Sequence, residues 1–276
     1  MARAENKTEA GGTARVVAAL AKALREQQRL SQEELGALIG YTGSAVSAME
    51  TCAQPASDQM LIKLEESIGL GLGVFEKARG YIRADKYPPL FKDFAPLEQK
   101  ALSLQSYAML VVHGLFQTEA YARALIGGGY PPLSKQRVAE LVEARMTRKS
   151  LFDRDPTVLI ELVLDESALR RAVGSKEIMR EQLIRLVEYG ELRNVTLQVM
   201  PLARGLRGEH AGLHGEITLL ESPDHEHVAY LEAQDESLLI SDPAKVTTYT
   251  HRYAKIRAQA LGPDESLGLI EQLAGE

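Results

Sequence analysis

The stretch YTGSAVSAMETCAQPA (residues 41–56) is rich in small polar side chains and contains no lysine or arginine. No basic residue occurs anywhere between Arg29 and Lys63. Such side chains can still recognise a partner. A hydroxyl group both donates and accepts hydrogen bonds, and a methyl group can contact another methyl group, such as that of thymine. The candidates for these contacts are Thr42, Gly43, Ser44, Ala45 and Ser47. These residues could therefore bind a partner through hydrogen bonds and methyl contacts, without a charged side chain.

Four of the six histidines lie near one another in the sequence: His210, His214, His225 and His227. The first two are four residues apart, a spacing that places two imidazoles on one face of a helix and suits zinc. The glycines around them, Gly208, Gly212 and Gly215, favour a loop instead. We therefore expect no bound metal and no other cofactor.

Two adjacent carboxylates, Asp165 and Glu166, follow an apolar run and could act as an acid–base pair. In the more ordinary interpretation, Asp165 caps the short helix ESALRRAV and Glu166 lies at its positive end. Glu161 interrupts the apolar run itself, which indicates an edge strand or a polar cavity. No phosphate-binding loop, nucleophile elbow or dinucleotide-binding motif is present, so we expect no catalytic residue.

The residues on either side of position 41 predict the helices that position the neutral stretch. Ser31 and Glu34 form a capping box at the start of one helix. The apolar face of that helix contains Leu35, Leu38 and Ile39. Gly40 ends it, and a second short helix runs as far as Met49. Two short helices joined by a glycine-containing turn form a helix-turn-helix, whose second helix presents its first residues to base edges in the major groove of DNA.

Flanking residues would supply contacts with DNA phosphates. Gln32 and the backbone N–H groups near Ser31 could hold one phosphate at a helix start. Arg15, Arg25 or an N-terminal arm could add charge, since residues 1–30 contain six basic and three acidic residues. Because phosphate neutralisation supplies most of the affinity for DNA, we expect weak binding by each monomer and poor non-specific binding.

The composition is that of an ordinary globular protein: 45% of the 276 residues are hydrophobic and 25% are charged. The net charge of −6 is not that of a protein coated in nucleic acid. No apolar run is long enough to span a bilayer, and the polar N-terminus lacks a secretory signal, so we expect a cytoplasmic protein without membrane contact. The single cysteine, Cys52, excludes an internal disulfide and a cysteine-rich zinc site.

Short helices account for the first 80 residues. A first helix should close near Gln28, a fourth should follow Ser57 as its cap, and GLGVFEKARGYI predicts a fifth. We therefore expect a mostly α domain over residues 1–80. The segment RADKYPPLFKDFAP has three prolines and mixed charge, and we place a linker at residues 81–95.

The rest of the chain mixes helices and strands. Helical patterns cover residues 97–126 and 133–153, and further helices are expected at residues 175–189 and 243–273. Five β-prone segments lie among them: TVLIELVLDE, NVTLQVMP, EITLLE, HVAYLEA and SLLIS. This order indicates an α+β domain over residues 96–276 with a mainly antiparallel sheet.

Motifs in both halves of the chain resemble those of known bacterial regulators. LSQEELGALIGYTGSAVSAME resembles the Xre-type helix-turn-helix of bacterial repressors. The C-terminal part resembles a domain of unknown function found in the WhiJ-like regulators of actinomycetes. The motifs that carry this second resemblance are HGLFQTEAYARALI, LVLDESALRRAVG, REQLIRLVEYGELRNVTLQVMPL and GEITLLESPD. In this family the third helix usually carries basic residues, at about the positions held here by Gly43 and Ala48.

The resemblance implies a transcriptional regulator of development or secondary metabolism. In such a regulator a small partner protein encoded nearby, or a ligand, acts on the C-terminal domain, and no enzymatic activity is implied. We expect a homodimer that binds double-stranded operator DNA.

Two other functions are open. One is a protein-interaction module in which a degenerate helix-turn-helix contacts protein through its neutral stretch. The other is a toxin-like effector or enzyme housed in residues 96–276, with Asp165, Glu166 or the histidines as its chemistry.

Overall fold

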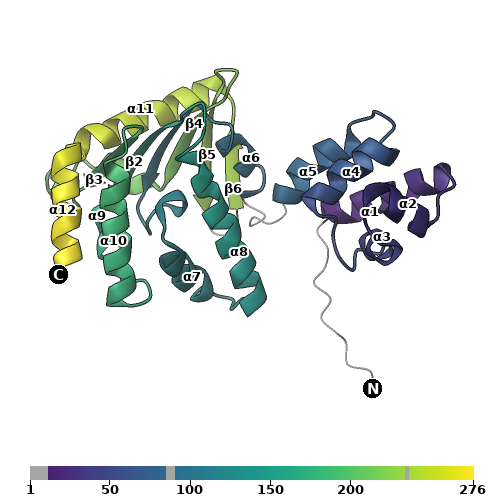
Figure 1. The fold of residues 1–276 in the computed structure, drawn as a ribbon. Helices are drawn as coiled ribbons and strands as arrows, with labels where there is room; N and C mark the ends of the chain where they lie inside the picture. Colours follow the sequence, from purple (N-terminus) through teal and green to yellow (C-terminus); the bar gives the residue numbers. More distant parts are fainter. Residues whose placement is uncertain (1–11, 85–90, 234–235) are drawn as a thin grey trace. The chain divides into compact units, whose positions relative to one another are not determined.

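The computed structural model describes residues 12–84, 91–233 and 236–276. The chain divides into two compact units, residues 1–86 and residues 87–276 (Figure 1). The N-terminal arm expected to add positive charge belongs to residues 1–11, which lie outside the described residues.

The interval expected to be a linker, residues 81–95, contains ordered structure at both ends. Residues 81–84 complete the last helix of the first unit, and Phe91 and Phe94 pack against the core of the second. Residues 85–90 lie outside the described residues.

In the first unit the described residues form five helices: α1 (Gly12–Gln27), α2 (Gln32–Ile39), α3 (Gly43–Glu50), α4 (Asp58–Ile68) and α5 (Val74–Ala84). Local signals in the sequence begin and end these helices. The capping box at α2 is confirmed: the Ser31 hydroxyl accepts a hydrogen bond from the Glu34 N–H at 3.1 Å, and the Glu34 carboxylate accepts one from the Ser31 N–H at 2.7 Å. Ser57 caps α4, as predicted. Gly40 ends α2 in the left-handed conformation, with φ of 74°.

The turn between α2 and α3 depends on close backbone approach. A Cβ at position 36 would lie 2.8 Å from the carbonyl oxygen of Tyr41, closer than a side chain can come, so only glycine fits there. The two helices then bury one face each in a shared apolar core. Its most deeply buried members include Leu35, Val46, Met49, Leu61, Leu64, Ile68 and Phe75.

The second unit is built on a six-stranded sheet in the order β3-β2-β1-β4-β5-β6. Its strands are β1 (Ser103–Ala108), β2 (Leu159–Asp165), β3 (Val195–Met200), β4 (Ile217–Glu221), β5 (His227–Ala233) and β6 (Glu236–Ile240). The pairings β1–β2 and β2–β3 are parallel, and β1–β4, β4–β5 and β5–β6 are antiparallel. The predicted α+β class is confirmed, with a mixed sheet in which antiparallel pairings are the majority.

One prediction in this unit is wrong, because residues 97–126 are not helical throughout. Residues 103–108 form β1, which lies between β2 and β4 in the middle of the sheet. Four of its six residues are buried, including the polar Ser106, whose hydroxyl is 3.2 Å from that of Thr218 on β4. Pairing with strands that lie far away in the sequence thus overrides the local helical pattern.

The helices of this unit are α6 (Ala95–Glu98), α7 (Glu119–Gly127), α8 (Lys135–Thr147), α9 (Glu166–Arg170), α10 (Lys176–Gly190), α11 (Pro243–Gln259) and α12 (Pro263–Gly275), with short 3-10 helices η2 (Gly114–Phe116), η3 (Arg148–Leu151), η4 (Leu202–Arg207) and η5 (Ala211–His214). They form a layer on each face of the sheet (Figure 1). Helix α11 covers one face, where Tyr253 and Ile256 pack against Val163 and Ile217.

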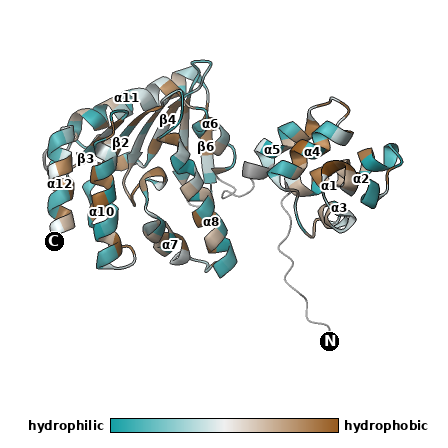
Figure 2. Ribbon diagram, viewed as in Figure 1, coloured by the Kyte–Doolittle hydropathy of each residue, from teal (hydrophilic) through white to brown (hydrophobic). Residues whose placement is uncertain are grey.

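The opposite face carries the larger core and the helices α7, α10 and α12. Tyr121, Leu183 and Ile270 contribute to it from these three helices. Helix α8 lies on the same side and alternates hydrophilic and hydrophobic residues along its length (teal and brown in Figure 2), with Val142 and Ala144 buried. Parallel strands need crossover connections, and here α7 and α8 connect β1 to β2 while α9 and α10 connect β2 to β3.

Candidate functional site

The N-terminus of α3 is shaped by the side chain that caps it. Thr42 precedes the helix in an extended conformation, and its hydroxyl accepts a hydrogen bond from the Ala45 N–H at 3.2 Å. The same hydroxyl is 2.9 Å from the hydroxyl of Ser44. Both side chains are exposed, so they present two adjacent hydroxyl groups to solvent at the start of the helix.

The five residues predicted to contact bases lie together in the first two turns of α3. Thr42 and Ser44 are exposed, and Gly43, Ala45 and Ser47 are half-buried. The opposite side of the helix, which carries Val46 and Met49, faces the core. A Cβ at position 43 would lie 3.1 Å from the Glu33 backbone, so glycine here also lets the starts of α2 and α3 pack closely.

The structure gives Arg25 a different role from the predicted phosphate contact. Its side chain is buried, with a residue exposure of 8%, and bonds to Glu50 at the end of α3: Nε to Oε1 at 2.6 Å and Nη2 to Oε2 at 3.0 Å. Nη1 donates to the Leu30 carbonyl at 2.7 Å. The guanidinium therefore joins α1 to α3 inside the unit, and its contact with DNA phosphate stays a prediction.

Gln32 belongs to the same buried network. Its side-chain amide donates a hydrogen bond to Oε2 of Glu50 at 2.8 Å. Burial alone would raise the pKa of Glu50, but the hydrogen bonds from Arg25 and Gln32 outweigh it and leave that pKa below its usual value. Glu50 is thus held as a carboxylate, and the start of α2 is tied to the end of α3. Arg15 remains exposed on α1.

The charge of the first unit is balanced. Residues 12–84 contain eight basic and eight acidic residues. Arg25 is neutralised by Glu50, and Arg79 forms ion pairs with Asp58 at 2.8 Å and with Glu76 at 2.6 Å. Residues 12–84 therefore carry no net positive charge.

The carboxylates considered for acid–base chemistry have internal partners. Asp165 caps α9, as predicted, by accepting a hydrogen bond from the Ser167 N–H at 3.0 Å, and it also accepts one from the Tyr107 hydroxyl at 3.0 Å. Glu166 pairs with Arg170 at 2.7 Å. Glu161 lies on β2, an interior strand, so the edge-strand interpretation is wrong; its carboxylate pairs with Arg257 of α11 at 3.1 Å.

Two of the four neighbouring histidines, His210 and His225, have separate partners. His210 precedes the 3-10 helix η5, and its Nδ1 accepts a hydrogen bond from the Gly212 N–H at 3.2 Å. His225 is 2.7 Å from the carboxylate of Glu221, in the turn between β4 and β5. Within the part of the chain that the structure describes, no three His, Cys, Asp or Glu side chains gather as they would around a metal ion.

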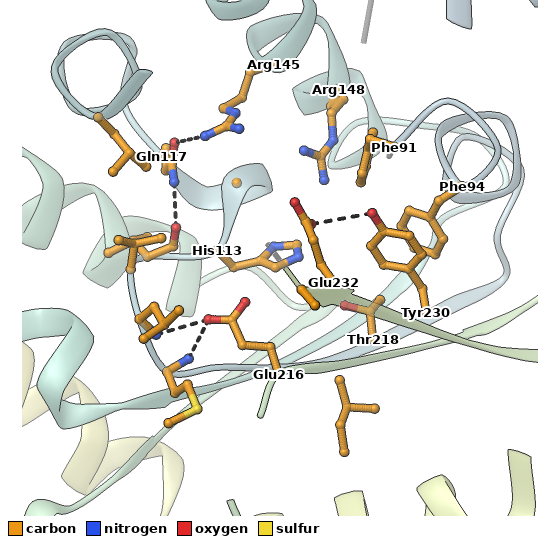
Figure 3. A pocket seen from close by; sticks show the side chains of 18 of the residues that line it. Phe91, Phe94, His113, Gln117, Arg145, Arg148, Glu216, Thr218, Tyr230 and Glu232 are labelled. Atoms are coloured by element: carbon orange, nitrogen blue, oxygen red, sulfur yellow. Dashed lines mark hydrogen bonds between the residues drawn. The ribbon is translucent and has the colours of Figure 1, made fainter. Parts of the chain in front are cut away.

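A cavity of about 500 Å³ in the second unit was not predicted from the sequence. Charged and polar side chains from distant segments line it (Figure 3): His113, Gln117, Arg145, Arg148, Glu216 and Glu232. The spacing of the two arginines, three residues apart, was the one local signal that they share a helical face. The other residues come from separate loops and strands, and no local pattern brings them together.

Two families match the sequence. Residues 22–75 match the helix-turn-helix family (HTH_3), and residues 91–272, more than half of the chain, match a domain of unknown function (DUF5753). Comparison with curated proteins gives no match, and neither does comparison with solved structures.

The helix-turn-helix match suggests a DNA-binding regulator. Neither family description mentions WhiJ-like proteins or actinomycetes, so that narrower resemblance stays a prediction. Among the described helices none has the length and apolar character needed to cross a bilayer. The order of the two matched regions agrees with the two units of the structure, and the chain belongs to the DUF5753 family, with a helix-turn-helix preceding that domain.

Proposed function

We propose that the protein is a cytoplasmic transcriptional regulator that acts by binding a DNA operator, not by catalysis. The observation that carries this proposal is the pair of exposed hydroxyl groups, Thr42 and Ser44, at the start of the second helix of a fully packed helix-turn-helix. In this motif these positions meet base edges in the major groove. Ser47 lies one turn further along the same helix.

The proposed contacts would give more specificity than affinity. Hydroxyl groups can bond several base edges, and Ala45 can contact a thymine methyl group. The balanced charge of the unit supports few phosphate contacts, so binding should depend only weakly on salt and non-specific binding should be poor. A homodimer would add the second half-site, about 34 Å away along the duplex.

Control through the second unit is the remaining part of the proposal. The resemblance to WhiJ-like regulators supports a role in development or secondary metabolism, with a small partner protein encoded nearby or a ligand acting on residues 96–276. Such an effector changes DNA affinity only if it binds one arrangement of the dimer better than another.

Fluorescence anisotropy on a fragment from the protein's own upstream region tests the DNA contact. The Ser44→Glu, Ser47→Glu double variant places two negative charges at the proposed groove surface. The control variant carries Ala19→Glu and Ala23→Glu, two exposed positions on α1. Titrations should run from about 50 to 200 mM salt, beside a scrambled fragment.

We expect the native protein and the α1 control to bind their own fragment selectively with a shallow salt dependence. The α3 variant should lose at least about tenfold in affinity, because a mismatched contact at one base pair typically costs about 1–3 kcal/mol and the two added carboxylates are also repelled by DNA. Circular dichroism checks that the variants fold alike. Equal affinity for the two fragments, or equal loss in the two variants, would contradict base reading by α3.

A second candidate function is a protein-interaction module. The neutral surface of α3 favours it, together with exposed apolar side chains in the same unit, Val16 and Leu38, whose exposures are 66% and 61%. The same titration separates the two functions, since an interaction module should bind neither fragment even at low salt.

A further inference from the structure

The cavity in the second unit has the size of a small-molecule site. Its volume of about 500 Å³ falls within the usual range for ligand pockets. Arg145 of α8 and Arg148 of η3 reach it from one side, β4 and β5 contribute Thr218 and Glu232, and His113 lies between these groups (Figure 3).

Arg145 lies in this cavity without a carboxylate partner. Among the described residues its one hydrogen bond runs from Nη1 to Oε1 of Gln117, at 2.7 Å, and no ion pair forms. Burial first, and then the neighbouring guanidinium of Arg148, lower the pKa of Arg145 to about 10, so it still carries its positive charge at neutral pH. The charge of Glu232, which also lines the cavity, partly counters this lowering, but among the described residues no carboxylate bonds to Arg145, so a bound anion would supply a direct partner.

Arg148 differs, because its counter-charge is built in. Its Nε and Nη2 donate to the two carboxylate oxygens of Glu98 at 2.7 and 2.6 Å, and its guanidinium lies 4.3 Å from the ring centroid of Phe91. A Cβ at Gly114 would lie 3.0 Å from Nη1 of Arg148 and 3.7 Å from Cζ of Arg145. The two guanidinium groups thus share one wall of the cavity.

His113 adds an unsatisfied polar atom beside the arginines. Its Nδ1 is buried and has no hydrogen-bond partner among the described residues. Burial and the charges of Arg148 and Arg145 lower the pKa of His113 to about 3, so the ring is neutral at physiological pH. A neutral imidazole can donate or accept one hydrogen bond to a molecule in the cavity.

Two carboxylates limit the charge that the cavity can accept. Glu216 accepts hydrogen bonds from the N–H groups of Met109 and Leu110, both at 3.0 Å. Burial, and then the charge of Glu216, raise the pKa of Glu232. A ligand with two negative charges would be repelled by these groups, whereas one negative charge would be offset by Arg145. Apolar residues complete the lining, among them Leu125, Ile126 and Leu141.

We propose that this cavity binds a small monocarboxylic acid with an apolar body, its carboxylate on Arg145 and its body against Leu125, Ile126 and Leu141. The bidentate geometry of a guanidinium suits a carboxylate, and the apolar lining gains free energy when it is covered. Binding itself is independent of the DNA contact. Control of DNA affinity by this ligand rests on the proposed function.

The test uses octanoate as the probe, with the neutral octanamide as its matched control and inorganic phosphate as a competing anion. Calorimetry and thermal unfolding of the full chain, without DNA, measure binding to the native protein, Arg145→Gln and Arg137→Gln. Arg137 is also on α8 but pairs with Glu140 and is not among the residues that line the cavity.

Octanoate at about ten times its dissociation constant should raise the Tm of the native protein and of Arg137→Gln by about 3–6 °C. Arg145→Gln should bind octanoate at least about thirtyfold more weakly, because truncation of one member of a buried charge pair removes most of its attraction. Octanamide and phosphate should leave the Tm unchanged.

The comparison of octanoate with octanamide needs no variant, so it decides the matter even if Arg145→Gln folds poorly. Equal binding of the two probes, or no binding of octanoate up to about 10 mM, would overturn the proposal. A final titration repeats the DNA anisotropy with octanoate. If octanoate binds in the calorimeter but leaves the DNA anisotropy unchanged, the ligand site stands and its control of DNA binding is rejected. Loss of DNA binding by the α3 variants bears on the proposed function alone.

Discussion

Arg25 in the first unit is buried and Arg145 in the second is half-buried, and the surroundings of their charged groups are opposite. Arg25 donates two hydrogen bonds to the Glu50 carboxylate and one to a backbone carbonyl. Arg145 donates one to the neutral side chain of Gln117 and faces a cavity.

The difference separates a structural charge from a charge that is free to bind. A buried ion pair with its hydrogen bonds satisfied holds helices together and offers nothing to a ligand. A charge to which the fold bonds no carboxylate, beside space for one, marks a candidate binding site. The residue type alone does not reveal this difference in role, since both residues are arginines on helices.

The largest test of this comparison is Glu50→Gln. It leaves Arg25 buried without its counter-charge, and breaking a buried pair in this way costs about 3–5 kcal/mol. Urea unfolding of the full chain, followed through NMR signals of the first unit, measures the loss. Glu66→Gln removes the carboxylate from an exposed pair with Lys63 and should cost less than about 1 kcal/mol. Similar losses in the two variants would mean that Arg25 does not depend on Glu50.

A pH titration gives the next largest effect, in the second unit. The folded-state pKa of His113 is about 3 against 6.5 for the ordinary side chain, so between these values the unfolded chain binds a proton that the folded one does not. Stability should therefore be full above pH 6.5 and fall as the pH drops toward 3, by about 1.4 kcal/mol per pH unit from this residue.

The His113→Gln variant isolates that contribution, because every other titrating group is common to the two proteins. Urea unfolding at several pH values should show a smaller decline below pH 6.5 in the variant than in the native chain. If the free energy of unfolding fell equally with pH in the two proteins, His113 would accept a proton in the folded state as readily as in the unfolded one. That result would contradict its burial beside Arg145 and Arg148.

The Arg145→Gln variant has the smallest expected effect on stability, and it tests most directly whether Arg145 differs from Arg25. Arg145→Gln removes one hydrogen bond, worth about 0.5–1.5 kcal/mol, and at the same time removes a partly buried charge that has no bonded carboxylate among the described residues. The two changes oppose each other, so urea unfolding should show a net change within about 1 kcal/mol. A loss above about 3 kcal/mol would make Arg145 a structural residue like Arg25.

Local signals in the sequence predicted the ends of helices well. Ser31 with Glu34, Ser57 and Asp165 all cap the helices assigned to them, because a cap is a contact between residues two or three apart. Strand β1 was missed for the converse reason. Its backbone bonds go to residues 159–164 and 217–221, and those partners are not visible in the local pattern.

The site residues divide in the same way. The exposed hydroxyl groups of Thr42 and Ser44 follow from a helix start and could be predicted. The role of Arg25 could not, since its partner Glu50 is 25 residues away and only the folded unit brings them together. The cavity is harder still, because Glu216 and Glu232 reach it from strands and loops far from Arg145.

The division of labour within α3 has a consequence for how such a protein can diverge. Val46, Met49 and Glu50 anchor the helix to its unit, while Ser44, Ala45 and Ser47 contribute little to that anchoring. In the proposed DNA-binding role, these three residues could therefore be exchanged to recognise a different operator while the scaffold stays intact. A library randomised at these three positions would sample new binding preferences on a single, constant fold.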